Sequence, residues 1–426
     1  MKRLLTLTIV LFVLLVNTSM AYAQPPALDA GAYILIDAKT GQVLCEKDSE
    51  TKTLFPASTT KIMTAILALE MGNLDQVMTA SQSAIDDIGP NGSNIGIIAG
   101  EKIRLEDLLK ALLISSANES ANIIAEHICQ TREEFISLMN LKAKELGAAR
   151  THFANACGMH DPDHYTTASD MAKIARYAMT IPKFREIVSM NSYQMPATNK
   201  HPSWPVLTNT NKLMITDKSD MYVINGIKTG YTGPAGHNLV SSAADATGME
   251  LIAVVMDVRN EKAAENVRIY SKELLDYGFN HFKRINLTEK GRVYRNVKVD
   301  AAIDTYGLDL IISNSLTCIV PKSEEMQNIK EIPHINEPIS APVNKGDIMG
   351  YVEFFKDGAS IGKVELTAAR FIGHKPEPVK LTTRIMEALD TLYIKIALIT
   401  AGALLFFIIL RKVLRRISRR VNARRY

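Results

Sequence analysis

The stretch Phe55-Pro56-Ala57-Ser58-Thr59-Thr60-Lys61 decides the interpretation of this sequence, because it places a serine and a lysine three residues apart. Pro56 fits the opening of a helix, which we expect to run to about Met71 with Ser58 in its first turn. Residues three apart share a helix face, so Lys61 can reach the Ser58 hydroxyl. A lysine whose pKa is lowered by burial can take the serine proton and create a nucleophile. Taken alone, the pattern is explained as simply by a capped helix with a surface lysine.

A second motif, Ser116-Ala117-Asn118, falls at a predicted break between helices over 104–114 and 119–130. The serine hydroxyl can relay protons, and the asparagine amide can bind a substrate carbonyl. An N-cap explains the same residues, because Ser or Asn followed by Glu119 suits a helix start. For this motif alone, the N-cap is the favoured interpretation.

A third motif, Lys228-Thr229-Gly230, ends a predicted strand over 223–228. The lysine supplies a second cation, and the threonine hydroxyl can bind a substrate carboxylate. The glycine permits close approach of an acyl chain to the strand. The alternative is an ordinary β-turn, which is what we expect of Lys39-Thr40-Gly41 in the same chain.

The order of predicted elements indicates an α+β domain followed by a small all-β domain. Strands are expected at 32–38, 42–46, 223–228, 239–244 and 250–257. Helices are expected between them, including one at about 168–180, and another at about 261–277. Strands at both ends suggest a mixed sheet, closed by the terminal segments and packed against helices. From about 284 short strands follow, including a hairpin over 349–366 with its turn at Asp357-Gly358.

The N-terminus has the layout of a secretory signal peptide. Lys2 and Arg3 precede an apolar run from Leu4 to Val16, and the small-x-small site Ala21-Tyr22-Ala23 follows. Cleavage is therefore expected after Ala23. An uncleaved anchor helix is the less favoured alternative, because the apolar run is short.

The C-terminus predicts a membrane anchor. Residues 393–410 are apolar apart from Lys395, whose long stem can snorkel, and they approach the roughly 20 residues needed to span a bilayer. The last sixteen residues carry eight Lys or Arg, which are expected to stay in the cytoplasm. The body of the protein would then lie outside. An amphipathic helix in the membrane plane is the alternative, because residues 381–392 are amphipathic.

Charge and cysteine content exclude several classes of protein. The net charge is +4, and setting aside the eight tail charges together with Lys2 and Arg3 leaves about −6 for the body. An acidic body argues against nucleic-acid binding. Four cysteines without a CxxC pair make a disulfide scaffold or a four-cysteine zinc module unexpected.

Together the three motifs are far more specific than each alone, and their order and spacing resemble those of a known family. The chain is similar to the low-molecular-mass penicillin-binding proteins that are D-alanyl-D-alanine carboxypeptidases. The resemblance rests on 55–61, on Ser115-Ser116-Ala117-Asn118-Glu119-Ser120-Ala121 and on Asn225-Gly226-Ile227-Lys228-Thr229-Gly230-Tyr231-Thr232. It extends to 32–46, 166–171, the β-rich domain and the C-terminal anchor.

This resemblance implies a penicillin-binding transpeptidase/β-lactamase-like domain, an antiparallel sheet with helices, acting on peptidoglycan stem peptides and acylated by β-lactam antibiotics. It implies the domains 1–23 (signal peptide), 24–283 (catalytic), 284–375 (β-rich), 376–392 (linker or amphipathic helix), 393–410 (transmembrane anchor) and 411–426 (basic cytoplasmic tail). Neither a cofactor nor a metal is expected.

Residue roles also follow from the resemblance. Ser58 would be the acylated nucleophile, Lys61 its general base and Ser116 the third catalytic residue. The N–H groups of Ser58 and Tyr231 would form the oxyanion hole. The residues implied in substrate binding are Asn118, Lys228, Thr229, Gly230, Tyr231 and an arginine, for which Arg268 is the candidate and Arg259 the rival.

Other features carry weaker signals. His160 and His164 could suggest a metal site, but Pro162 and the lack of a third ligand favour a solvated loop. Cys157 is expected to be a packed small residue, because no basic partner is evident. A β-lactamase or a β-lactam-binding sensor could carry the same motifs. The first would need a Glu-x-x-Leu-Asn-like element, and the second a cytoplasmic domain larger than sixteen residues.

Overall fold

The computed structural model describes residues 24–89, 91–304, 306–323, 329–356, 358–376 and 380–422. The expected signal peptide, residues 1–23, lies outside the described residues. Contacts divide the chain into two compact units, the first formed mainly by residues up to Thr288 and the second mainly by residues from Glu289 onward.

The first unit is organised around a five-stranded sheet with the order β2-β1-β9-β8-β7. Its strands are β1 (Ala32–Asp37), β2 (Val43–Lys47), β7 (Tyr222–Thr232), β8 (Gly236–Asp245) and β9 (Glu250–Val258). Every neighbouring pair is antiparallel. The prediction of a mixed sheet from element order is therefore wrong, because tight turns join the last three strands and β1 runs antiparallel to β9.

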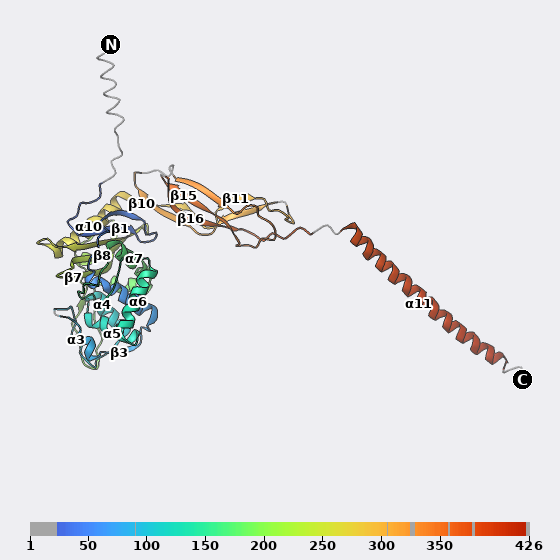
Figure 1. Cartoon of the computed structure of the whole chain (residues 1–426), viewed down its shortest axis with the longest axis horizontal. Helices are drawn as coiled ribbons and strands as arrows, with labels where there is room; N and C mark the ends of the chain where they lie inside the picture. Colours follow the sequence, from blue (N-terminus) through green and yellow to red (C-terminus); the bar gives the residue numbers. More distant parts are fainter. Residues whose placement is uncertain are drawn as a thin grey trace, which may run out of the picture. The chain divides into compact units, whose positions relative to one another are not determined.

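Both faces of the sheet are buried at β1, which explains why this strand is apolar up to Asp37. Successive side chains of a strand point to opposite faces. Ile34 and Ile36 accordingly enter a core shared with the helices α2 (Lys61–Met71) and α7 (Ala168–Ala178). Leu35 enters a second core against α10 (Ala263–His281). Figure 1 shows α10 and α7 beside the strands of this sheet.

The helices that carry or support the site are α2 (Lys61–Met71), α4 (Leu105–Ile114), α5 (Asn118–Ile128), α6 (Arg132–Glu145), α7 (Ala168–Ala178) and α8 (Pro182–Val188). The sequence predicted α2, α4, α5 and α7 but not α6. Only Phe135, Met139 and Ala143 of α6 are buried. Ile136, Leu138 and Leu141 are apolar but are not buried, so the apolar residues do not mark a single face and the helical pattern is weak.

The remaining short elements of this unit are η1 (Ala57–Thr60), α3 (Gln82–Asp86), α9 (Lys212–Thr216), the pair β3 (Val77–Thr79) and β4 (Lys102–Arg104), and the pair β5 (Ser192–Tyr193) and β6 (Leu207–Thr208).

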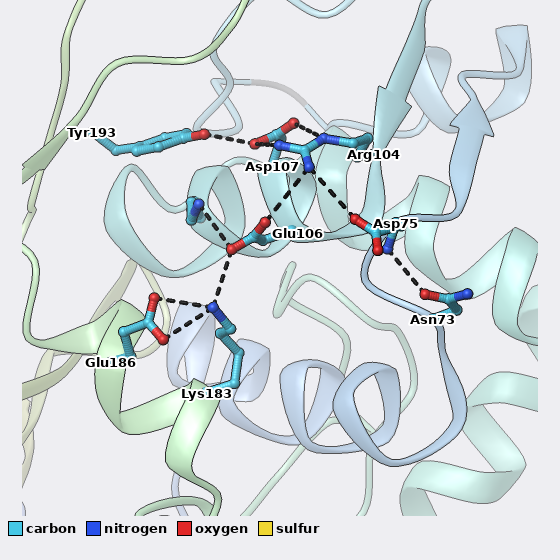
Figure 2. A network of polar contacts seen from close by, with 9 residues as sticks. Asn73, Asp75, Arg104, Glu106, Asp107, Lys183, Glu186 and Tyr193 are labelled. Carbon is cyan, nitrogen blue, oxygen red and sulfur yellow. Dashed lines mark hydrogen bonds and ion pairs between the residues drawn. The ribbon is translucent and has the colours of Figure 1, made fainter.

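A polar network fixes the start of α4 against α8 and β5 (Figure 2). The buried Asp107 accepts hydrogen bonds from Arg104 Nε at 3.1 Å and from the Tyr193 hydroxyl at 2.6 Å. Lys183 on α8 donates to Glu106 at 3.1 Å. Since Asp107 and Glu106 lie in the first turn of α4, the network also complements the positive end of that helix.

The second unit contains most of a five-stranded sheet with the order β11-β12-β16-β15-β14. The strands are β11 (Val293–Val297), β12 (Leu308–Ile312), β14 (Ile329–Ile335), β15 (Ile348–Lys356) and β16 (Ala359–Ala368). The predicted hairpin corresponds to β15 and β16. A separate two-stranded pair consists of β10 (Phe282–Thr288), which follows α10, and β13 (Leu316–Pro321), which lies between β12 and β14 in the sequence.

The C-terminal part is one continuous helix, α11 (Leu381–Asn422). Residues 381–419 are long and apolar enough to cross a membrane, with a mean hydropathy of 2.4 in the most apolar window and no burial. The linker, anchor and tail expected as separate segments are thus largely joined in a single helix.

Strand β7 approaches η1 so closely that no side chain fits at Gly230. A Cβ there would lie 2.8 Å from the Pro56 carbonyl oxygen and 3.0 Å from the Thr59 nitrogen. The strand continues to Thr232, so Lys228-Thr229-Gly230 lies inside it and not at its end as predicted. This glycine serves the contact between strand and turn.

We expect Gly230→Ala to destabilise the protein by about 1–3 kcal/mol, because the strand and the turn would have to separate. Thermal unfolding should show a lower Tm. Gly233→Ala is the matched control, since nothing lies within 4 Å of a Cβ at that position. Equal changes in Tm for the two variants would contradict this account of the packing.

Candidate active site

Ser58 lies in the short 3₁₀ turn η1, and α2 begins only at Lys61. The expectation that Ser58 occupies the first turn of an α-helix is therefore wrong in detail. The preceding residue, Ala57, has a φ of +49°, in the left-handed region that non-glycine residues rarely adopt. This backbone turns the chain sharply before the helix and leaves the Ser58 side chain partly exposed.

Neighbouring segments hold η1 from several sides. A Cβ at Gly158 would lie 2.0 Å from the Ala57 carbonyl oxygen, so a loop packs directly against the turn. From β8, the buried Asn238 amide donates to the carbonyls of Phe55 at 2.9 Å and Pro56 at 3.1 Å. Because the turn is held by backbone contacts and buried hydrogen bonds, Ser58 is positioned by the fold.

Lys61 contacts Ser58 directly. Its Nζ donates to Ser58 Oγ at 2.8 Å, to Asn118 Oδ1 at 2.7 Å and to the Cys157 carbonyl at 2.7 Å. These three bonds use all three ammonium protons. The side chain is fully buried, which excludes the alternative of a surface lysine.

Burial lowers the pKa of Lys61 to about 8, although Cys157 and Glu119 act to raise it. Removal from water disfavours the ammonium form, and the nearby negative charge only partly compensates. A lysine with this pKa has an appreciable neutral fraction near neutral pH, as a general base requires.

The middle motif lies where α4 ends and α5 begins. Ser116 is buried with a φ of +63°, and it lines the same cleft as Ser58. Asn118 is the first residue of α5, and the N-cap is Ala117, without a side-chain cap. The N-cap interpretation of this motif is thus wrong, because Asn118 instead accepts from Lys61 and donates to the Ile88 carbonyl at 2.9 Å.

The strand motif brings a second buried lysine near the first. Lys228 is 1% exposed, and its Nζ donates to the Thr229 carbonyl at 3.0 Å. Burial lowers the pKa of Lys228 well below its usual value, and the charge of Lys61 lowers it further. The Thr229 hydroxyl hydrogen-bonds the Thr210 hydroxyl at 2.7 Å.

The two candidate arginines have different surroundings. Arg268, on α10, lines the cleft that contains Ser58 and forms ion pairs with Asp217 and, at 3.8 Å, with Glu265. Arg259 pairs with Asp257 and donates to backbone carbonyls of the turn between β7 and β8. Geometry therefore favours Arg268 as the arginine available to a bound ligand.

A single cleft of about 830 Å³ collects most of the predicted site residues. Those that line it are Ser58, Ser116, Asn118, Thr229, Gly230, Tyr231 and Arg268. Lys61 and Lys228 are buried. The Tyr231 side chain is 60% exposed and stacks on His237, with ring centroids 4.3 Å apart. Among the described residues lining the cleft there is no Asp or Glu.

Sequence reasoning missed several supporting residues. His164 is buried and its Nε2 lies 2.7 Å from Thr60 Oγ1, so the expectation of a solvated loop is wrong at this position. Burial lowers the pKa of His164 to about 4, which keeps the ring neutral. Cys157 is buried as expected, but its carbonyl also binds Lys61. Thr210 and Asn238 stand outside the three motifs, so no local pattern marked them.

Comparisons with known proteins agree with this geometry. The family model described as D-alanyl-D-alanine carboxypeptidase matches residues 19–260. A second, described as the C-terminal domain of penicillin-binding protein 5, matches residues 282–373. The two matches correspond to the α/β domain with the cleft and to the all-β domain.

Curated relatives cover nearly the whole chain. The D-alanyl-D-alanine carboxypeptidase DacF of Bacillus subtilis is 31% identical over 86% of this chain and 94% of its own length. DacC of Escherichia coli is 29% identical over 79% and 83%, respectively. The crystal structure of penicillin binding protein 5 from Haemophilus influenzae matches with a TM-score of 0.71 and 27% identity, covering 83% of this chain and all of that one. The chain belongs to the D-alanyl-D-alanine carboxypeptidase family of serine penicillin-binding proteins.

Proposed function

We propose that this protein is a serine-type D-alanyl-D-alanine carboxypeptidase that removes the terminal D-Ala from peptidoglycan stem peptides through an ester on Ser58. The observation that carries the proposal is the 2.8 Å contact between Lys61 Nζ and Ser58 Oγ beside a cleft lined by Ser116, Asn118 and Thr229. The family match supports the reaction, and this contact supports the nucleophile.

Acylation begins when neutral Lys61 takes the Ser58 proton. Oγ then attacks the carbonyl carbon of the terminal peptide bond, and the negative charge on the carbonyl oxygen is stabilised by the N–H groups of Ser58 and Tyr231. The tight packing of Gly230 on η1 supports this pairing, because a Cβ at Gly230 would lie 3.2 Å from the Ser58 nitrogen. The geometry thus brings the β7 backbone to the nucleophile.

Collapse of the tetrahedral intermediate breaks the C–N bond and leaves the acyl group on Ser58 Oγ. The departing amine of D-Ala needs a proton, which Lys61 holds after the first step. Ser116 can relay that proton, because it lines the cleft and has a hydroxyl that both donates and accepts. Water then hydrolyses the ester, and the Ser58 proton is restored.

Recognition of the substrate involves its terminal carboxylate. Thr229 and Arg268 line the cleft and can bind this group, with Lys228 buried at the adjoining strand position. A carboxylate near Lys228 favours the ammonium form of that lysine. In the empty site, burial and the charge of Lys61 lower the pKa of Lys228, so a bound carboxylate compensates for an otherwise unfavourable ammonium group.

A β-lactamase or a β-lactam sensor is not favoured. A β-lactamase needs a base that activates water for rapid deacylation, and the described residues lining the cleft include no carboxylate. We therefore expect β-lactams to form a long-lived ester. Release of D-alanine from a stem-peptide mimic, measured beside β-lactam turnover, separates the functions: rapid turnover without D-alanine release would refute the carboxypeptidase.

We further propose that the catalytic unit faces the exterior of the cytoplasmic membrane. The signal peptide at 1–23 would export it, α11 would anchor it, and the eight basic residues after 410 would remain in the cytoplasm. The apolar helix 381–419 supports the anchor.

Ser58→Ala should abolish labelling by a fluorescent penicillin, because the ester has no other oxygen to form on. Fluorescence of the protein band after denaturing electrophoresis measures this directly, and thermal unfolding checks that the variant is folded. Persistent labelling of a folded Ser58→Ala protein would show that another residue is acylated.

Lys61→Arg should lose roughly 10²–10⁴ in acylation rate, because arginine keeps the charge but cannot give up its proton. The acylation rate is measured by labelling with a fluorescent penicillin that is quenched at successive times. A near-normal rate in Lys61→Arg would mean that residue 61 acts only as a fixed cation.

Truncation after Lys375 should release a secreted, soluble protein that still cleaves small peptides, because the three motifs all precede residue 232. High salt should not release the full-length protein, since charges near anionic lipid add only about 1 kcal/mol each and the apolar span provides most of the retention. Sedimentation of membranes with and without salt tests both points. A truncate that stays in the pellet, or a full-length protein released by salt, contradicts the single C-terminal anchor.

A further inference from the structure

The segment over residues 91–98 contributes to one wall of the cleft through its first three residues and is tied to the middle motif. Asn91, Gly92 and Ser93 line the cleft. Ser93 Oγ donates to the Ser115 carbonyl at 3.2 Å, and the Asn118 N–H donates to the Ser93 carbonyl at 2.8 Å. The same Asn118 whose side chain contacts Lys61 thus holds the start of the wall.

Glu119, the next residue of α5, holds the middle of this wall from a fully buried position. Its Oε1 accepts a hydrogen bond from the Ile95 N–H at 2.7 Å. Its Oε2 is buried without a hydrogen-bond partner among the described residues. Burial raises the pKa of this carboxyl, with backbone N–H groups acting in the opposite direction. These N–H groups include those of Gly96 and Ile97, so the carboxylate acts on several residues of the segment.

Glu101 shows what fastening alone looks like. It is equally buried, and its Oε2 accepts from the Ile98 N–H at 3.1 Å at the other end of the same wall. Its Oε1 is fully engaged, by Thr198 and by His201 Nδ1 at 2.8 Å. Glu101 is not among the groups that shift the pKa of Lys61, whereas Glu119 is.

Glu119 differs in chemical type from the other titratable groups that act on Lys61. Among the described residues, four titratable groups interact electrostatically with Lys61: Lys228 on β7, His164, Cys157 and Glu119. Of these, Glu119 is the only carboxylate. It adjoins Asn118, which is hydrogen-bonded to Lys61 Nζ.

We propose that Glu119 is a positioning residue that couples the segment over residues 91–98 to Lys61, holding this segment through Ile95 while its negative charge retains the proton on Nζ in the empty site. The inference rests on the proposed roles of Ser58 and Lys61. A group that both seats the wall and sets the charge of the base links substrate binding to activation.

The test is the pH dependence of acylation by a fluorescent penicillin, with the full-length protein in detergent, from about pH 6 to 10. The wild-type rate should rise as Lys61 loses its proton, with a midpoint near 8 as expected from its lowered pKa. In Glu119→Gln the negative charge is gone, so Lys61 should lose its proton at lower pH. The rate at the acid end, relative to the plateau, should increase roughly 3–10-fold, which corresponds to about half to one pH unit.

Glu101→Gln is the matched control. It weakens a hydrogen bond to the same segment, but it does not remove a carboxylate that acts on the pKa of Lys61. Its midpoint should equal that of the wild type. An unchanged midpoint in Glu119→Gln, or an equal shift in Glu101→Gln, would overturn the inference.

Glu119→Asp provides a second arm if Glu119→Gln does not fold. It keeps the charge but is one methylene shorter, so the hold on Ile95 weakens. In Glu119→Asp the midpoint of the pH dependence should stay unchanged. The penicillin concentration that gives a half-maximal acylation rate should rise. A midpoint moved to lower pH in Glu119→Asp would also overturn the inference. If the wild-type protein is not acylated, the proposed function itself fails, a result distinct from either outcome.

Discussion

The burial of the Lys61 ammonium group is the constraint on which the site depends. A buried lysine is tolerated only when its protons are satisfied, and three acceptors from three different parts of the chain do so here: Ser58 Oγ, Asn118 Oδ1 and the Cys157 carbonyl. Each acceptor reaches Lys61 Nζ only when its own segment of the chain is correctly placed. The 3₁₀ turn, the break between α4 and α5 and the loop around Gly158 therefore converge on one atom.

The same constraint explains the choice of residues at the edge of the sheet. Lys228 brings a second amine into a dry region, where two ammonium ions oppose each other. One of the two lysines must then be easily deprotonated. Burial lowers the pKa of both lysines, and the charge of Lys61 lowers the pKa of Lys228 further, so ordinary lysine side chains become basic amines near neutral pH.

The sequence predicted the residues of the three motifs better than it predicted the residues that hold them in place. Three-residue spacing indicated that Ser58 and Lys61 share a helix face, but their roles followed from the resemblance of the three motifs together to a known family. Most strands and helices followed from their periodicity. Asn118 was assigned to an N-cap when taken alone, because a local pattern cannot show that Lys61 lies beside it. His164, Thr210 and Asn238 were missed for the same reason: each acts through a contact with a residue far away in sequence. The weakly patterned α6 and the antiparallel course of β1 likewise depend on tertiary packing.

The close packing of η1 against β7 and the Gly158 loop has a consequence for resistance to β-lactam antibiotics. Backbone segments enclose η1 at Gly230 and Gly158, and added side chains at either position would strike main-chain atoms. Substitutions there would damage the nucleophile for substrate and antibiotic alike. Substitutions that discriminate between substrate and antibiotic are thus expected at side chains of the cleft lining outside η1, such as Asn91, and not in the turn itself.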